Sequence, residues 1–152
     1  MTRYLLSLGS NQGDRREEMA LATAYVAQLG SVVAASPTVE TAAWGLSEAA
    51  LPVDARTYCN CLLDVESELL PWRLHALLVA HEDARGRERG RRNAARRIDI
   101  DILAAQRTTM HAASLHLPHP RLFGRDYLRA LLSSLPTRQD WEAQLRAAGL
   151  AP

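Results

Sequence analysis

The apolar residues of the chain recur with two different spacings, and the order of these patterns predicts its secondary structure. Alternation of apolar and polar residues is typical of half-buried strands, whereas spacings of three and four are typical of helices. We expect strands at 4–8, at 32–41 with an interruption near Pro37, at 57–66 and at 98–103. We expect helices at 15–29, 71–85, 125–134 and 138–148.

The ends of the two longer helices carry residues that favour helix starts and stops. Asp14 precedes the helix at 15–29 as a good N-cap, and Gly30 follows it. Pro71 suits the first turn of the next helix, and Gly86 ends that helix. These signals fix the boundaries of both helices.

The expected order of elements is β-α-β-β-α-β followed by two helices. This order predicts an α+β protein of the ferredoxin-like type, with an antiparallel sheet flanked by helices in an α/β/α sandwich. At 152 residues the chain is long enough for one domain with a real core, so we expect a single domain over 1–152.

Composition narrows the possible partners. Hydrophobic residues make up 47% of the chain and the formal net charge is +1, which argues against a generic nucleic-acid or membrane surface. No apolar run approaches the length that crosses a membrane. Cys59 and Cys61 should share one buried strand face with Leu63, and no second cysteine pair completes a zinc site. Because no signal peptide precedes the first strand, we expect the protein in the reducing cytoplasm.

The most informative segment joins a basic run to an acidic strand. Seven arginines fall within 85–97, and Asp99 and Asp101 alternate with isoleucines just after them. At about 3.3 Å per residue, the two carboxylates project from one face roughly 6.6 Å apart. Two such like charges favour a cation between them, and Mg²⁺ beside guanidiniums is what a polyphosphate needs.

Each of these features also has an ordinary explanation. The aspartates could form the polar side of a half-exposed strand, and the arginines could form a solvated surface. The glycine-containing turn at 9–14 could be structural, although such turns also cradle anions through backbone amides. His119, held between two prolines, could simply be exposed. Tyr58, Asn60 and Tyr127 could be core and surface residues with no special role.

Taken together, the motifs resemble those of the 6-hydroxymethyl-7,8-dihydropterin pyrophosphokinase family of folate biosynthesis. The resemblance covers nearly the whole chain. It rests on Leu8-Gly9-Ser10-Asn11-Gln12-Gly13-Asp14, Tyr58-Cys59-Asn60, Arg96-Arg97-Ile98-Asp99-Ile100-Asp101-Ile102-Leu103 and Leu117-Pro118-His119-Pro120-Arg121. It implies Mg²⁺-dependent transfer of pyrophosphate from ATP to the hydroxymethyl group of the pterin, with release of AMP.

The resemblance also implies roles for individual residues. The residues implied to be catalytic are Arg87, Arg89, Arg96, Asp99 and Asp101, with the two aspartates holding two Mg²⁺ ions. Those implied to bind ATP are Glu82, Arg87, Arg89, Arg96, His119 and Arg125. Those implied to bind the pterin are Thr41, Ala42, Trp44, Tyr58, Asn60 and Tyr127. The expected partners are ATP and a pterin, with no nucleic acid or membrane, and the expected state is a monomer.

Some positions depart from the family pattern. Where the family usually has Trp-Gly-Pro-Arg, this chain has Asn93-Ala94-Ala95-Arg96, and the segment from Trp44 to Thr57 is longer than usual. One alternative is therefore a diverged paralogue that acts on another pterin-like alcohol, or binds pterin or nucleotide without this catalysis. Another is a ferredoxin-like nucleic-acid module, which the near-neutral charge and the lack of an aromatic RNP-type strand oppose.

Overall fold

The computed structural model describes residues 1–42, 56–87, 95–122 and 124–150. Within them, five strands form one antiparallel sheet. Four of them follow the order β2-β4-β1-β5, and β3 pairs with the first residues of β4, whereas β2 pairs with its later residues. The strands are β1 (Thr2–Ser10), β2 (Ser31–Ala35), β3 (Val39–Ala42), β4 (Thr57–Ser67) and β5 (Asp99–Ala105). The central position of β1 accounts for its long run of buried residues, since it has neighbours on both sides.

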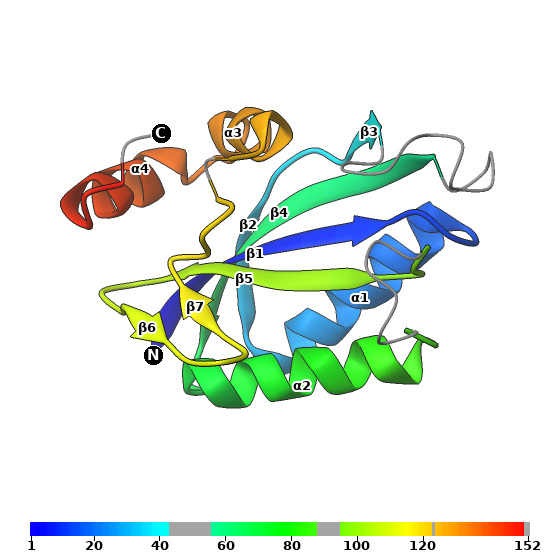
Figure 1. The fold of residues 1–152 in the computed structure, drawn as a ribbon, viewed down its shortest axis with the longest axis horizontal. Coiled ribbons are helices and arrows are strands. Elements are labelled where there is room, and N and C mark those ends of the chain that lie inside the picture. The colour runs from blue at the N-terminus through cyan, green and yellow to red at the C-terminus, as the bar shows by residue number, and fades with distance from the viewer. Residues whose placement is uncertain (43–55, 88–94, 123, 151–152) are drawn as a thin grey trace.

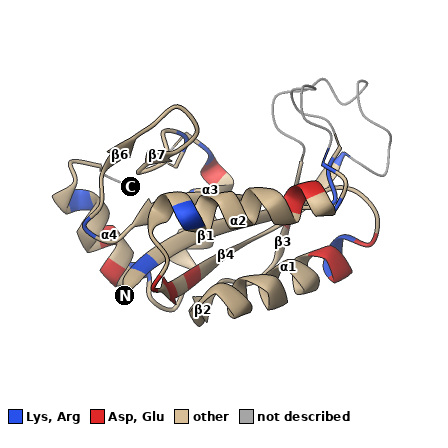
Figure 2. Ribbon diagram, turned by 90° about the horizontal axis from the view of Figure 1, so that it is seen from below, with Lys and Arg blue, Asp and Glu red and all other residues tan. Residues whose placement is uncertain are grey.

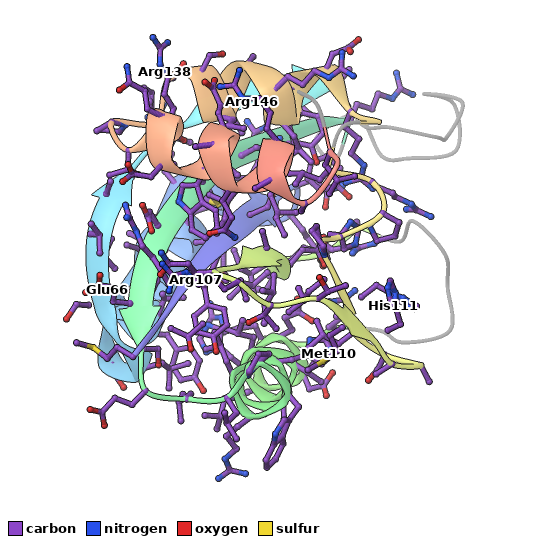
Figure 3. The ribbon with its side chains drawn as sticks, turned by 90° about the vertical axis from the view of Figure 1, so that its left-hand side faces the viewer. Glu66, Arg107, Met110, His111, Arg138 and Arg146 are labelled. Carbon is purple, nitrogen blue, oxygen red and sulfur yellow. The ribbon has the colours of Figure 1, made fainter. Side chains whose placement is uncertain are left out.

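Helices cover both faces of this sheet. They are α1 (Arg15–Leu29), α2 (Pro71–Ala84), α3 (Asp126–Ser133) and α4 (Arg138–Ala147). In Figure 1, α1 and α2 lie below the sheet while α3 and α4 lie above it. Figure 3 shows the same layers from the end where α4 lies, with Arg138 on the outside of the molecule. The predicted α+β sandwich with an antiparallel sheet is confirmed.

Each layer of helices encloses its own hydrophobic cluster. On the α1 and α2 side, Leu6, Leu8 and Cys61 pack with apolar residues of the two helices. On the other side, Leu5 and Leu62 pack with residues of α3 and α4. Alternate residues of β1 and β4 therefore serve the two clusters in turn, as the alternation in the sequence predicts.

The predicted helix ends agree well with the structure. Helix α1 has the predicted bounds, and the side chain of Asp14 accepts a hydrogen bond from the backbone N–H of Glu17 at 3.1 Å. The expected strand at 32–41 is two strands that both pair with β4. Between them, the Ser36 hydroxyl accepts a hydrogen bond from Leu62 N–H, so the chain stays beside β4 across the break.

A small hairpin is the one described element that the sequence patterns did not predict. It consists of β6 (Met110–His111) and β7 (His116–Leu117), which form a separate two-stranded sheet. Strands of two residues are too short to show an alternating pattern. The hairpin leads into the Pro118–Arg121 connector, where His119 N–H donates to the carbonyl of Leu103 at 2.7 Å and ties the connector to β5.

Candidate active site

Polar residues from three strands meet on one face of the sheet, where β1 ends and β4 and β5 begin. Gly9 of β1 pairs with Asn60 of β4 on one side and with Asp99 of β5 on the other. Two residues earlier, Ser7 pairs in the same way with Asp101. Directly paired residues of antiparallel strands share a face. The register therefore places the predicted metal-binding and pterin-binding residues on the same face of the sheet.

The same face is covered at its other end, which limits where a ligand can bind. There Leu5, Leu62 and Leu103 are buried under α3 and α4, with Trp141 and Leu145 in the same cluster. The face thus changes from apolar to polar along the strands. Its polar end lies at the right of Figure 1, next to the start of α1 and the end of α2.

Asp99 is the centre of a cluster of charges. Arg96 Nη1 lies 2.7 Å from Asp99 Oδ2, and Arg87 Nη1 lies 2.9 Å from Asp99 Oδ1. The second approach lacks hydrogen-bond geometry, so Oδ1 is buried without a hydrogen bond from any described residue. Although burial opposes the charge of Arg96, the carboxylate of Asp99 holds its pKa above the usual value. Two predicted phosphate ligands therefore meet one predicted metal ligand.

Glu82 lies behind this cluster at the end of α2, where it is only 2% exposed. Its carboxylate accepts a hydrogen bond at 2.7 Å from the backbone N–H of Ile100, between the two aspartates, and contacts Arg87. Burial and the neighbouring charge of Asp99 raise the pKa of Glu82. Glu82 thus fixes the backbone of β5 at the point from which both aspartates project.

The third carboxylate near Asp99 and Glu82 is that of Asp101, whose charged form is disfavoured by its surroundings. Burial, together with the charges of Asp99 and Glu82, raises its pKa to about 7. A cation bound between carboxylates removes such repulsion and favours their charged forms. The chemistry of this oxygen-rich set, and the Asp99 oxygen without a hydrogen bond, therefore fit a hard divalent cation.

The carboxylates fit Mg²⁺ bound together with a substrate better than a cage made by protein alone. Among the described residues, no group of three or more His, Cys, Asp or Glu side chains is arranged to hold a metal ion. Mg²⁺ in phosphate-transfer sites is commonly held by one or two carboxylates, with phosphates and waters completing its shell. Asp99 and Asp101 provide that number of carboxylates.

The predicted pterin residues on β3 and β4 are joined by a hydrogen bond. Asn60 is 4% exposed, and its amide Nδ2 donates to Thr41 Oγ1 at 2.6 Å. A Cβ on Gly9 would come within 2.9 Å of Asn60 Oδ1 and 3.7 Å of Tyr58 Cδ1. The absence of a side chain at Gly9 therefore leaves room for the amide of Asn60. Burial also raises the pKa of Tyr58, so its hydroxyl stays protonated at neutral pH.

Two further predicted residues, Arg125 and Tyr127, lie at the start of α3 and contact each other. Arg125 Nη1 donates to the hydroxyl oxygen of Tyr127 at 2.9 Å, and its guanidinium carbon lies 5.9 Å from the centroid of that ring. In the connector before them, His119 Nδ1 accepts a hydrogen bond from Arg121 N–H at 3.2 Å. Burial, followed by the charge of Arg125, lowers the pKa of His119, which favours a neutral imidazole.

The structure thus brings some predicted residues together and leaves others undetermined. Arg87, Arg96, Asp99 and Glu82 form one charge cluster. Asn60 contacts Thr41, and Arg125 contacts Tyr127, while Ala42 ends β3 in an exposed position. Trp44 and Arg89 lie outside the described residues, as do Asn93 and Ala94 of the altered motif.

Sequence reasoning missed two residues that support this site. Asn11 is fully buried, and its Oδ1 accepts a hydrogen bond at 2.8 Å from the backbone N–H of Arg96. Glu18, which the sequence explains as an acidic residue near a helix start, pairs with Arg85 and Arg97. The signals for Asn11 in the sequence were its place in a glycine-containing turn and in the Leu8–Asp14 motif, and neither shows that it is buried or which group it contacts. No local pattern predicts partners that lie 67 and 79 residues away.

The protein is an α+β protein with a ferredoxin-like sandwich. Carboxylates and guanidiniums gather at one end of its sheet, which places it in a class suited to polyphosphate ligands. The sequence profile described as 7,8-dihydro-6-hydroxymethylpterin-pyrophosphokinase (HPPK) matches residues 5–136. The chain therefore belongs to this family of transferases of folate biosynthesis. No helix among the described residues is long and apolar enough to cross a membrane.

Curated relatives carry the corresponding name, 2-amino-4-hydroxy-6-hydroxymethyldihydropteridine pyrophosphokinase. The protein of Methylorubrum extorquens is 36% identical over 78% of this chain and 73% of its own length. That of Mycobacterium leprae is 34% identical over 99% of this chain and 78% of its own. That of Bacillus subtilis is 30% identical over 91% and 80%.

A solved structure supports the fold independently of sequence. The HPPK-DHPS protein of Plasmodium falciparum, crystallised with SDX-DHP, matches with a TM-score of 0.56 and 9% identity. The match covers 97% of this chain and 45% of the Plasmodium chain. At this identity the comparison shows a common fold alone.

Proposed function

We propose that the protein transfers the terminal pyrophosphoryl group of ATP to 6-hydroxymethyl-7,8-dihydropterin in a Mg²⁺-dependent reaction. The observation that carries this proposal is the register of Gly9, which pairs with Asn60 on one side and Asp99 on the other. Gly9, which has no side chain, thus lies between β4, whose residues suit a heterocycle, and β5, whose residues suit metal-bound phosphate. Family membership gives the pyrophosphokinase chemistry.

The proposed reaction needs placement and charge neutralisation more than covalent help from the protein. The hydroxymethyl oxygen of the pterin bonds to the β-phosphorus of ATP and loses its proton. The bond from the β-phosphorus to the oxygen bridging it to the α-phosphorus breaks, and AMP leaves with that oxygen. No covalent intermediate on a side chain is required.

We assign the phosphate end of the site to the charge cluster. Asp99 and Asp101 would hold two Mg²⁺ ions, which supply positive charge to the phosphate oxygens when bound. Arg87, Arg96 and Arg89 would bind phosphate oxygens through charge-assisted hydrogen bonds. In the structure Arg87 and Arg96 already converge on Asp99, so a bound cation would replace them there and leave them available to the triphosphate. Glu82, His119 and Arg125 are assigned to the nucleotide.

We assign the pterin end to the strands on the other side of Gly9. The rings of Tyr58 and Tyr127 would sandwich the pterin, and the Asn60 amide would bond its edge. Thr41, Ala42 and Trp44 would add main-chain contacts. The Asn60–Thr41 hydrogen bond supports this assignment, because it holds the amide in one orientation before the ligand arrives. We further propose that the chain is a single domain over 1–152 and acts as a cytoplasmic monomer.

Product analysis tests this proposal. The protein is incubated with ATP, MgCl₂ and 6-hydroxymethyl-7,8-dihydropterin, and the nucleotides and pterins are separated by chromatography. We expect AMP and a pterin diphosphate in equal amounts, and no product when EDTA replaces Mg²⁺. Formation of ADP would contradict pyrophosphoryl transfer. Tight pterin binding without AMP would instead favour a diverged paralogue that binds without this catalysis.

A further inference from the structure

Glu18 is a buried carboxylate that receives three charged hydrogen bonds outside the set of residues assigned to either substrate. It lies near the start of α1 and is 4% exposed. Arg85 donates to it through Nε at 3.0 Å and Nη2 at 2.6 Å, and Arg97 donates through Nη1 at 3.2 Å. The paired donors of Arg85 give the two-pronged geometry that is strong and directional for a carboxylate.

The partners of Glu18 stand next to the arginines of the site. Arg85 caps α2, two residues before Arg87, and Arg97 directly follows Arg96. Arg87 and Arg96 in turn both lie against Asp99. Figure 2 shows the charged residues at the end of α2 and at the start of α1 at the same end of the molecule.

Asp99 and Glu18 therefore each contact both backbone segments, 85–87 and 95–97, from different sides, and Glu82 contacts Arg87 in the first segment as well. Asp99 contacts Arg87 and Arg96, but these contacts must break if Asp99 binds a cation. Glu18 contacts Arg85 and Arg97 and is not assigned to a cation. The ion pairs of Glu18 would persist when the contacts of Asp99 with the arginines are exchanged for a cation. They would keep Arg87 and Arg96 within reach of the phosphates.

The electrostatics of Glu18 suit a permanent tie. Burial alone would raise the pKa of Glu18, but the guanidiniums of Arg85 and Arg97 outweigh burial and hold it below its usual value. The carboxylate is thus charged at neutral pH. Gly13 lies beside this contact: its φ of 71° favours glycine, and a Cβ there would be in ordinary contact with Arg97 Nη1 at 3.6 Å.

We infer that Glu18 is a positioning residue for nucleotide binding, which ties Arg85 and Arg97 together so that Arg87 and Arg96 stand correctly for the phosphates of MgATP. This inference rests on the proposed function for the identity of the ligand. It adds a residue on α1 to a site otherwise built from the sheet, the end of α2 and the start of α3. The role is distinct from catalysis, since Glu18 acts only through other residues.

The test compares Glu18→Gln with Glu17→Gln, which removes an equal charge from the adjacent, exposed position of the same helix. Calorimetry measures the Kd of a non-hydrolysable ATP analogue with Mg²⁺, and steady-state kinetics measure kcat and both KM values. Loss of a residue that orients binding groups from outside typically costs roughly 10- to 100-fold in affinity or activity, so we expect Glu18→Gln to raise the analogue Kd and the KM for ATP about tenfold. We expect kcat and the KM for pterin to stay near wild type, and Glu17→Gln to change nothing.

A second variant keeps the test decisive should Glu18→Gln fold poorly. Arg97 has a half-exposed side chain, so Arg97→Gln removes one tie with little cost to folding. We expect it to weaken analogue binding in the same direction, and the Glu18→Gln/Arg97→Gln double variant to add less than the sum of the two effects. A lower Tm with unchanged analogue Kd would show a purely structural role and overturn the inference. Wild-type protein that binds the analogue but releases no AMP would instead refute the proposed function, leaving the tie testable.

Discussion

Replacing Gly9 with alanine tests how closely the two halves of the site are packed. The new Cβ would lie 2.9 Å from Asn60 Oδ1, closer than carbon and oxygen normally approach, and 3.7 Å from Tyr58 Cδ1. The backbone of Gly9 is ordinary strand, so alanine itself causes little strain there. The amide of Asn60 must therefore move, and its 2.6 Å hydrogen bond to Thr41 Oγ1 must lengthen or break.

The size of the effect follows from that hydrogen bond. Disturbing a buried polar contact costs about 1–3 kcal/mol, which corresponds to a roughly 5- to 150-fold weaker Kd. We expect this loss in pterin binding, because the three atoms nearest the new Cβ all belong to β4. Binding of the Mg²⁺–ATP analogue is assigned to β5 and should change by much less.

Calorimetric titration of Gly9→Ala with the pterin and, separately, with the ATP analogue measures both effects. Gly124→Ala is the matched control, since among the described residues a Cβ at Gly124 would meet only Arg121 O, at 3.9 Å. A pterin Kd within twofold of wild type would refute the packing argument. Equal weakening of both ligands would also refute it, because that outcome indicates a general loss of structure rather than a local displacement of Asn60.

Two further predictions concern the core of the fold. Cys59 and Cys61 are buried, and burial raises the pKa of Cys61 to about 12. A disulfide reagent at pH 8 should therefore react slowly with the native protein and rapidly with both thiols in guanidinium. Fast labelling of the native protein would contradict the burial. Asp64 is fully buried and paired with Arg3 at 2.6 Å, so Asp64→Ala should lower the free energy of unfolding by about 3–5 kcal/mol in urea titrations. Asp140 pairs with the same arginine but is 63% exposed, so Asp140→Ala should lower the free energy of unfolding by at most about 1 kcal/mol. Equal losses for the two variants would refute the role of burial.

The sequence predicted the fold well where local chemistry decides it. Asp14 and Gly30 delimit α1, and the alternation around Asp99 gives β5, because capping and strand periodicity act between near neighbours. The order of elements was then enough to give the antiparallel sheet. The two-residue strands β6 and β7 were missed because so few residues show no period.

The site was only partly predictable, for a related reason. Motif residues such as Asp99 and Asn60 could be identified from the chain, but their common face depends on the pairing of both with Gly9. The ties made by Glu18 and Asn11 join residues 67 or more positions apart, and a charged residue near a helix start already has a local explanation. Such contacts become visible only when the strands and helices are placed.

We propose that the carboxylates of β5 serve pyrophosphoryl transfer beside a separate pterin subsite. The decisive experiment is single-turnover measurement of Asp101→Asn, with pterin binding measured on the same preparation. Loss of a preorganised charged group commonly costs about 10³-fold in rate, so we expect AMP formation to fall at least that far while the pterin Kd stays near wild type. A rate within tenfold of wild type would contradict the claim.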